Sequence, residues 1–264
     1  MKKYTEHVVV SMTSFFARIN SVHKVVQNLL KQSVKPDLIV LYLSLDEFAD
    51  KCLPKQLIDL QNNKMFQIRF VAGDLKSYKK LVYALSDFPD STIITVDDDI
   101  LYPRYAIKEL LKTHQVYPED ICAHRIRKIN IKNNMIQSYN LWPLSEQRRG
   151  CFLKYKRGVD LFFCGCGGVL YPPRSLDSEV LNVSKFLKLC KHQDDVWFWA
   201  MAIKNNRKIV STKHGYNLRK RTIQDVQSVG LWETVNSKIE SPNNKAIENV
   251  LMAYPEIKEK LGMK

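Results

Sequence analysis

Three consecutive carboxylates, Asp97 to Asp99, directly follow the apolar run Ile93 to Val96. Like charges this close raise one another's pKa, so such a run is costly unless a cation shares the site. Carboxylate oxygens suit Mg²⁺ or Mn²⁺, and a diphosphate would add further oxygen ligands. The alternative is a solvated acidic turn that caps a helix beginning near Pro103. The position after an apolar strand favours the metal site, because ligands of open α/β sheets bind beyond the carboxyl ends of the strands.

A second pair of carboxylates, Asp194 and Asp195, opens the apolar run Val196 to Trp199. Removing a proton from an attacking hydroxyl requires a base, and a carboxylate on the first turn of a buried helix suits that task. Aspartate at a helix start is also a good cap, and one pair can serve both purposes.

Apolar periodicity predicts the elements that must position these acids. In the first half of the chain, short apolar runs alternate with segments of helical spacing. This alternation predicts right-handed crossovers and an α/β fold with a doubly wound, mostly parallel sheet and helices on both faces. The expected strands are His7 to Val10, Leu38 to Leu43, Phe66 to Val71 and Ile93 to Val96, and the expected helices are Ser21 to Leu30, Pro54 to Asn62 and Ser77 to Phe88.

The pattern changes after a helix predicted over Tyr105 to Val116. Asn133-Asn134 tolerates the dihedral angles of a tight turn and predicts a hairpin. The other expected elements are a strand over Ile121 to Ile126, a basic loop over Lys154 to Gly158, helices over Val183 to Cys190 and Asp194 to Lys204, a strand over Lys208 to Ser211 and a helical segment after Pro242.

Composition limits the classes of partner and compartment. Lysine and arginine total 41 against 27 acidic residues, a net charge of +14, which attracts phosphates, nucleic acid or an anionic membrane face. Nucleic acid is not an expected partner, because no known binding motif appears and the basic residues are spread along the chain. The start of the chain lacks a secretory apolar segment, and no run reaches the roughly 18 apolar residues of a membrane span. We therefore expect a cytoplasmic protein.

Six cysteines lack the paired spacing of a zinc site, and we expect them to be reduced and mostly in the core. They are Cys52, Cys122, Cys151, Cys164, Cys166 and Cys190.

Several segments together resemble a known family. Ser11 to Ser14 with Arg18, then Asp74 to Lys80, then Thr95 to Asp99 are similar to bacterial GT-A fold glycosyltransferases that build surface polysaccharides such as lipopolysaccharide or capsule. Gly167 to Pro173 and Asp194 to Phe198 match further along the chain. The resemblance implies a GT-A-type nucleotide-sugar-binding fold. It also implies one catalytic domain over residues 1–240, with a donor-binding half over 1–118 and an acceptor-binding half over 119–240, followed by a helical tail over 241–264.

The resemblance implies a donor-binding set whose chemistry suits a nucleotide sugar. Hydroxyls would bond the ribose, Arg18 and a lysine would meet the diphosphate, and Asp74 would bond the uracil ring. The alternatives are a solvent-facing Arg18 and lysines on the wet side of an amphipathic helix. The implied donor-binding residues are Thr13, Ser14, Arg18, Asp74, Lys79, Lys80, Asp97 and Asp98.

For the metal, the resemblance implies Asp99 and Asp97, with His214 as a third ligand after the strand Lys208 to Ser211. Imidazole suits Mn²⁺ better than Mg²⁺, so a ligating His214 would favour manganese. The alternative for His214 is a surface or capping histidine.

For the acceptor, the resemblance implies that Asp195 is the base, that Asp194 orients the acceptor and that the anomeric carbon is inverted. Gly167 and Gly168 would let a sugar approach the backbone, and Trp197 would contact the acceptor. The alternatives are a tight bend at the glycines and a core role for the tryptophan.

Together these features predict a metal-dependent glycosyltransferase that moves a sugar from a UDP-sugar to a glycan or lipid-linked glycan. The resemblance places it at the inner face of a bacterial membrane, where the +14 charge is compatible with peripheral contact with anionic lipid. One alternative is a sugar-phosphate nucleotidyltransferase. That class is expected to have a glycine-rich loop after the first strand, whereas Ser11 to Phe16 contains no glycine. The other is a non-catalytic nucleotide- or nucleic-acid-binding protein with the same fold.

Overall fold

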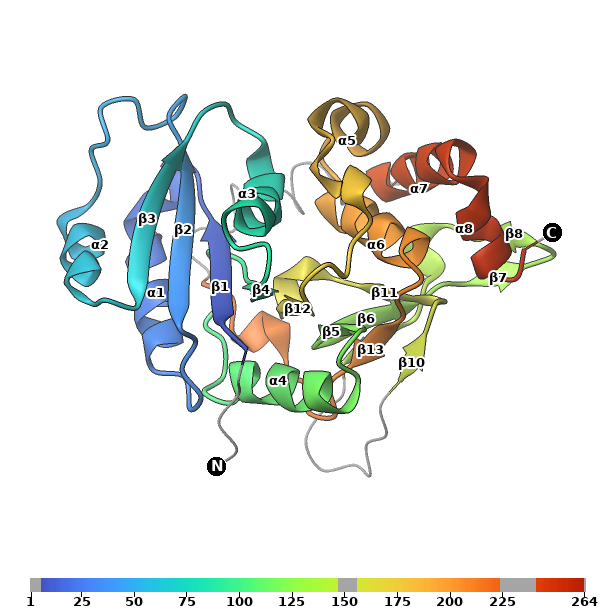
Figure 1. Cartoon of the computed structure of the whole chain (residues 1–264), viewed down its shortest axis with the longest axis horizontal. Helices are drawn as coiled ribbons and strands as arrows, with labels where there is room; N and C mark the ends of the chain where they lie inside the picture. Colours follow the sequence, from blue (N-terminus) through green and yellow to red (C-terminus); the bar gives the residue numbers. More distant parts are fainter. Residues whose placement is uncertain (1–5, 147–155, 224–240, 264) are drawn as a thin grey trace.

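An eight-stranded sheet crosses the middle of the protein, in the order β10-β13-β5-β12-β4-β1-β2-β3 (Figure 1). The computed structural model describes residues 6–146, 156–223 and 241–263. The strands β1 (Val8–Thr13), β2 (Leu38–Ser44), β3 (Phe66–Val71) and β4 (Thr92–Thr95) are mutually parallel. On the other side of β4, β12 (Val169–Tyr171) runs antiparallel between β4 and β5 (Ile121–Ala123), and β13 (Ile209–Ser211) is parallel to β5. The short β10 (Arg157–Gly158) closes this edge, antiparallel to β13.

The central strands β1 and β2 are buried on both faces, which explains why they are mostly apolar without alternation. Val9 and Val40 belong to one hydrophobic cluster, whereas their neighbours Val10 and Ile39 belong to another on the opposite face. The mostly parallel, doubly wound α/β fold expected from the sequence is confirmed.

Helices cover each face. On one side lie α1 (Ile19–Leu30), α2 (Lys55–Asp59) with the 3-10 turn η2 (Leu60–Asn62), and α4 (Ala106–Val116). On the other lie α3 (Lys79–Asp87), preceded by η3 (Lys76–Tyr78), and α5 (Val183–Cys190) and α6 (Asp194–Lys204), preceded by η6 (Ser178–Leu181). The expected bounds of β3, α5 and α6 are confirmed.

The segment after Pro242 is helical as expected, forming α7 (Pro242–Ala253) and α8 (Pro255–Lys260). Val250 and Ile257 are fully buried in the same hydrophobic cluster as α6. The helices α7 and α8 thus pack onto the body of the protein, and the division into two halves and a tail stays a prediction.

Two expectations need correction, one about a strand and one about a loop. Ile121 to Ile126 forms two strands in different sheets, because the chain bends at the buried His124, whose ring bonds to the Thr212 hydroxyl and the Ala106 carbonyl. The second of these strands, β6 (Arg125–Lys128), joins β11 (Leu161–Phe163) and β9 (Leu144–Glu146) in a three-stranded sheet. The expected loop Lys154 to Gly158 ends in β10, and its first two residues lie outside the described residues.

The hairpin at Asn133-Asn134 is confirmed. It joins β7 (Ile131–Lys132) to β8 (Met135–Ile136), and both asparagines have positive φ, 49° and 60°.

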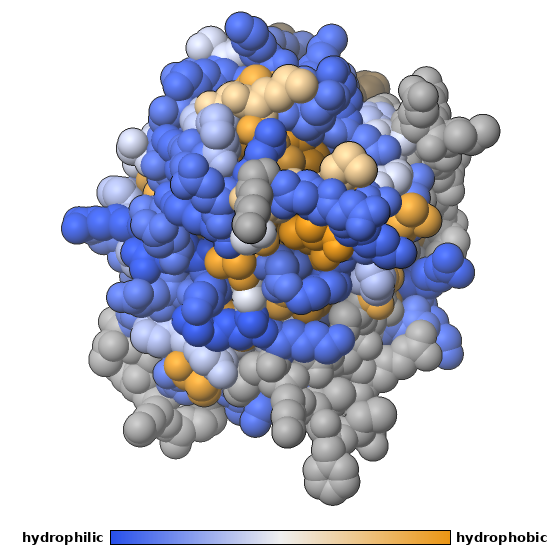
Figure 2. All heavy atoms as spheres, turned by 90° about the vertical axis from the view of Figure 1, so that its right-hand side faces the viewer, coloured by the Kyte–Doolittle hydropathy of each residue, from blue (hydrophilic) through white to orange (hydrophobic). Residues whose placement is uncertain are grey.

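The surface seen from the side of α7 and α8 is mostly hydrophilic. Around α7, α8 and the β7–β8 hairpin, hydrophilic residues cover most of the surface and hydrophobic ones show in separate patches (Figure 2). In the described part of the chain no helix combines the length and apolar character that a membrane crossing needs. Five cysteines are free thiols there, and Cys52 is exposed rather than in the core; Cys151 lies outside the described residues.

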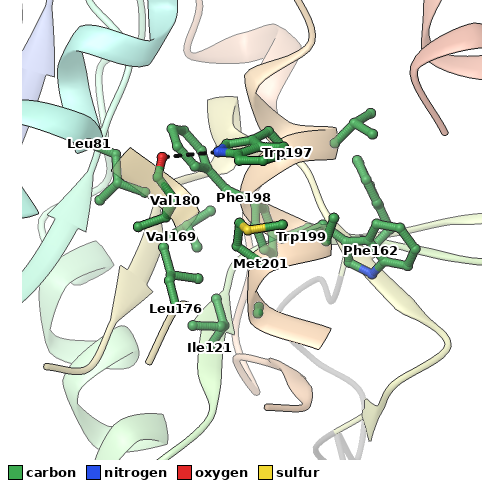
Figure 3. Packing of buried hydrophobic residues seen from close by; sticks show 14 of the residues in the cluster. Leu81, Ile121, Phe162, Val169, Leu176, Val180, Trp197, Phe198, Trp199 and Met201 are labelled. Atoms are coloured by element: carbon green, nitrogen blue, oxygen red, sulfur yellow. Dashed lines mark hydrogen bonds between the residues drawn. The ribbon is translucent and has the colours of Figure 1, made fainter. Parts of the chain in front are cut away.

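Trp197 anchors the core under α6. Its side chain is completely buried, and its indole N–H donates to the Val180 carbonyl at 3.0 Å, as Figure 3 shows.

We expect Trp197→Ala to lower the free energy of unfolding by about 3–5 kcal/mol, because it removes a large side chain and leaves a cavity. Urea unfolding followed by circular dichroism measures this. Leu187→Ala, at an exposed position of α5, is the matched control and should change stability by less than about 0.5 kcal/mol. Equal midpoints for the two variants would contradict this assignment.

Candidate functional site

The two groups of acids lie at one edge of the main sheet. Asp97 to Asp99 follow β4, whose neighbour β1 is parallel to it and pairs Ser11 with Thr95. On the other side of β4, Val169 of β12 pairs with Thr95, so the segment before β12, Gly165 to Gly168, also reaches this edge. The first turn of α6 supplies Asp194 and Asp195. The structure therefore brings both acidic motifs to the same place.

Arg18 holds the second and third aspartates of the triplet. Its Nη1 lies 2.9 Å from Asp98 Oδ1 and 3.0 Å from Asp99 Oδ2. The Ser14 hydroxyl donates to the other oxygen of Asp98 at 2.5 Å. Burial raises the pKa of Asp98 to about 6, although the charge of Arg18 and the Ser14 bond oppose the shift. Arg18 is buried, so the solvent-facing alternative is wrong.

Lys80 connects the first motif to the second. Its Nζ lies 2.9 Å from Asp97 Oδ1 and 3.2 Å from Asp194 Oδ2. Burial lowers the pKa of Lys80, but the charges of Asp194 and Asp97 outweigh it and raise the pKa well above its ordinary value. Lys80 is therefore a charged, buried residue that pairs with both Asp97 and Asp194. The alternative, a lysine on the solvent-exposed face of an amphipathic helix, is wrong for Lys80.

Asp195 has the environment of a base. Its Oδ2 accepts a hydrogen bond from the Gly165 N–H at 2.8 Å. A Cβ at Gly165 would lie 2.5 Å from Asp195 Oδ1, so the close packing requires glycine there. Burial and the charge of Asp194 raise the pKa of Asp195 to about 7, against the opposing charge of Lys80. A carboxylate that titrates near neutral pH is suited to accepting a proton from a substrate.

Two tyrosines that the sequence reasoning missed hold the glycine segment against the aspartates. The Tyr102 hydroxyl accepts from the Asp97 N–H at 2.9 Å and donates to the Cys166 carbonyl at 3.1 Å. The Tyr216 hydroxyl donates to the Gly167 carbonyl at 2.6 Å. The place of Tyr102 shortly after the acidic run, before Pro103, was a signal for it, whereas nothing local marks Tyr216.

Gly167 and Gly168 are needed for packing. A Cβ at Gly167 would lie 2.5 Å from Arg125 Cβ. Gly168 has a φ of 81°, a backbone angle that residues with a side chain rarely adopt. The tight-bend alternative therefore explains both glycines, and their contact with an acceptor sugar stays a prediction.

The three other expected donor-binding residues, Thr13, Asp74 and Lys79, also have partners within the protein. The Thr13 hydroxyl donates to the Tyr42 carbonyl at 2.8 Å, because β1 runs three residues further than expected. Lys79 is 1% exposed and pairs with Asp74 at 2.6 Å. Bonds from Lys76 and Lys79 outweigh burial and lower the pKa of Asp74 to about 2. Both ideas about Lys79, a diphosphate ligand or a wet helix face, are corrected, since its ammonium group is buried against Asp74.

The expectation that Trp197 contacts the acceptor is also wrong. Its side chain is 0% exposed and packs among core residues (Figure 3), so it offers no face on which an acceptor sugar could stack. The apolar run Val196 to Trp199 is buried throughout, because α6 is enclosed on all sides here.

Five carboxylates lie at this edge, Asp97, Asp98, Asp99, Asp194 and Asp195; Arg18 pairs with Asp98 and Asp99, and Lys80 pairs with Asp97 and Asp194. Carboxylate oxygens are the donors that a divalent cation prefers. As these side chains stand in the described residues, no three of them are grouped as a metal site. Of the triplet, Asp97 has the most accessible side chain, at 28%.

The third expected ligand, His214, is not gathered with the aspartates. Across residues 6–146, 156–223 and 241–263, no three His, Cys, Asp or Glu side chains form a group that could hold a metal ion. His214 as a ligand stays a prediction.

The sequence matches no protein-family profile and no curated protein. The fold, however, is similar to solved structures. The 1–349 portion of S. aureus TarS has a TM-score of 0.51 at 13% identity, covering 94% of this chain and 72% of that one. A 4-diphosphocytidyl-2C-methyl-D-erythritol synthase from Anaerococcus prevotii has a TM-score of 0.50 at 12% identity, covering 86% and 96%.

The fold is that of GT-A enzymes and nucleotidyltransferases. At these identities the likeness concerns the fold alone. The chemistry has to be argued from the residues at the edge of the sheet.

The buried Arg18 cluster predicts a stability effect. Arg18→Met removes the cation between Asp98 and Asp99 and should lower the free energy of unfolding by about 3–5 kcal/mol, because it leaves buried carboxylates unpaired. Urea unfolding measures the loss, and adding Asp98→Asn should restore part of it. The control is Arg174→Met, which breaks an exposed pair with Asp90 and should cost at most about 1 kcal/mol. Equal losses for the two arginine variants would show that the cluster is not structural.

Proposed function

We propose that this protein is a metal-dependent glycosyltransferase that moves a sugar from a nucleotide sugar to a hydroxyl of a glycan acceptor. One observation carries the proposal: Asp97, after β4, and Asp194, beside the base candidate Asp195, share the single ammonium group of Lys80. A donor site and an acceptor base are thereby held next to each other, as a direct transfer requires.

In the donor half, Asp97 and Asp99 would hold Mn²⁺ or Mg²⁺, and the cation would supply Lewis-acid assistance to the departing diphosphate. Ser14, Arg18 and Thr13 lie on the segment that follows or ends β1, where they would line the nucleotide. Lys80 is the better placed of the two lysines to meet the diphosphate, because it contacts Asp97 whereas Lys79 contacts Asp74. Asp74 would accept from the uracil ring.

In the acceptor half, Asp195 would take the proton of the acceptor hydroxyl. The hydroxyl oxygen forms a bond to the anomeric carbon while the bond from that carbon to the diphosphate oxygen breaks, with inversion. The nucleoside diphosphate leaves with the bonding electron pair. Asp194, fixed by Lys80, would orient the acceptor.

The same residues favour sugar transfer over nucleotide transfer. In a nucleotidyltransferase the nucleophile is a phosphate oxygen that is already ionised, so no base is needed. A half-buried Asp195 with a raised pKa suits a reaction in which a hydroxyl must lose a proton. The segment between β1 and α1 also lacks the glycines that such an enzyme would use.

The donor we propose is a UDP-sugar. The acceptor is a glycan or lipid-linked glycan of bacterial surface polysaccharide synthesis, handled at the inner face of the membrane. The family resemblance of the sequence motifs supports this finer assignment. A screen of UDP-sugars with several acceptors, reading UDP release with and without Mn²⁺, tests it, and release of pyrophosphate from a nucleoside triphosphate would favour the rival class.

Two substitutions separate the donor and acceptor roles. Asp97→Asn should weaken Mn²⁺-dependent UDP binding by at least about tenfold, because a hard cation loses a charged oxygen ligand. Asp195→Asn should leave UDP binding within about threefold and reduce transfer by about 10²- to 10⁴-fold, the usual contribution of a base. Calorimetry and UDP release give the two readouts. Asp90→Asn, at an exposed position, is the control, and undiminished transfer by Asp195→Asn would disprove the base assignment.

The raised pKa of Asp195 sets the pH dependence. Asp195 accepts a proton only when ionised, so kcat/KM should rise about tenfold per pH unit below pH 7 and level off above it. Initial rates with the acceptor well below its KM, measured across this range at constant ionic strength, give the profile. A flat profile through pH 7 would rule out Asp195 as the titrating base.

A further inference from the structure

The glycine segment, Gly165 to Gly168, carries the backbone group that binds Asp195. It lies between β11 and β12 and contains the 3-10 turn η5 (Gly165–Gly167). The Gly165 N–H donates to Asp195 Oδ2 at 2.8 Å. A Cβ at Gly165 would lie 2.5 Å from Asp195 Oδ1 and 3.3 Å from Lys80 Nζ, so the backbone packs directly against both side chains. A shift of this segment would therefore move Asp195 or break its hydrogen bond.

The bonds inside the segment do not fix its position. The Gly167 N–H donates to the Cys164 carbonyl at 3.0 Å, and the Gly168 N–H donates to the Gly165 carbonyl at 2.9 Å. These bonds shape the turn without joining it to another element. Glycine has no side chain to pack and more backbone freedom than other residues. The position of the segment therefore depends on bonds from outside it.

Two buried tyrosines supply such bonds. The Tyr102 hydroxyl donates to the Cys166 carbonyl at 3.1 Å, and the Tyr216 hydroxyl donates to the Gly167 carbonyl at 2.6 Å. The two rings are in T-shaped contact, with 6.1 Å between their centroids. A Cβ at Gly168 would lie 3.5 Å from Tyr102 Cε1, so the ring of Tyr102 also packs on the segment.

The hydroxyl of Tyr102 also joins the two sides of the candidate site. It accepts from the Asp97 N–H at 2.9 Å while it donates to the Cys166 carbonyl. The end of β4 and the segment that binds Asp195 are thus connected through one oxygen atom. Lys80 connects side chains of the two sides, whereas Tyr102 connects their backbones.

We propose that Tyr102 and Tyr216 are positioning residues for transfer, whose hydroxyls set the place of the glycine segment and thereby of the Asp195 carboxylate relative to Asp97. This inference rests on the proposed function. Geometry has a large effect on such a reaction, because a displacement of about 1 Å can reduce the rate by about a hundredfold.

The protonation of Asp195 reports whether the glycine segment is in place. Burial and the charges of Asp194 and Asp97 raise the pKa of Asp195, whereas the charge of Lys80 and the bond from the Gly165 N–H lower it. Burial raises the pKa of the tyrosine and cysteine side chains near Asp195, so they stay neutral around pH 7. These side chains are Tyr78, Tyr139, Tyr171, Cys164 and Cys166.

The first test does not depend on activity. The full chain is labelled with carboxyl-¹³C aspartate, and the NMR signal of Asp195, assigned by its loss in Asp195→Asn, is followed against pH. Tyr102→Phe and Tyr216→Phe each leave a carbonyl of the segment without its donor. The Gly165 bond should weaken, and the pKa of Asp195 should rise by about half a pH unit or more.

The matched control is Tyr42→Phe. Tyr42 is also buried, and its hydroxyl donates to Asp87 at 2.7 Å. It lies on β2, and β4 and β1 stand between β2 and β12. This variant loses the same atom and should leave the titration of Asp195 unchanged. If Tyr102→Phe does not fold, Tyr216→Phe still tests the inference.

The second test uses turnover. Each of the two variants should lower kcat about tenfold at pH 7, leave the KM of the donor within about threefold and move the kcat/KM profile to higher pH. Variants that are less stable but titrate Asp195 like the Tyr42→Phe control would overturn the inference, since the tyrosines would then only support the fold. If no donor is turned over, the proposed function fails, whereas the NMR titration still decides whether the tyrosines position Asp195.

Discussion

The ion pairs of Lys80 hold the candidate site together. One buried ammonium group contacts Asp97 at the end of β4 and Asp194 at the start of α6. The backbone of the same residue is fixed to β1, because its carbonyl accepts from the Ser11 hydroxyl. Without this charge the buried Asp194 would be left uncompensated, which is costly. Lys80 therefore holds the end of β4 and the start of α6 next to each other.

Arg18 has a similar effect within the acidic triplet Asp97 to Asp99. As a result, these chemically identical residues lie in different environments. Asp98 is held by Arg18 and Ser14 and is buried, whereas Asp97 keeps a partly exposed carboxylate. Arg18 and Ser14 thus compensate the buried Asp98, while Asp97 stays partly exposed. The proposed cation site rests on this difference between neighbouring carboxylates.

The fold limits the chemistry without choosing it. The fold of this protein is similar to that of TarS and of a 4-diphosphocytidyl-2C-methyl-D-erythritol synthase. The features from which we propose sugar transfer are local: a half-buried Asp195 bound to the Gly165 N–H, and a segment after β1 without glycine. Such features are a few side chains on a common scaffold, which is why function has to be argued from the site.

The sequence by itself determined the mostly parallel α/β fold class, the bounds of β3, α5 and α6, and the two acidic motifs, because these depend on local periodicity and on which residues follow a strand. The tertiary structure alone decided what covers each face. Lys79 and Lys80 are adjacent on one helix, yet one pairs with Asp74 and the other with Asp97 and Asp194. Tyr102 and Tyr216 hold the glycine segment, and Trp197 lies in the core. Periodicity shows which side of a helix is turned inward, but the partner on that side comes from distant residues that only folding brings near.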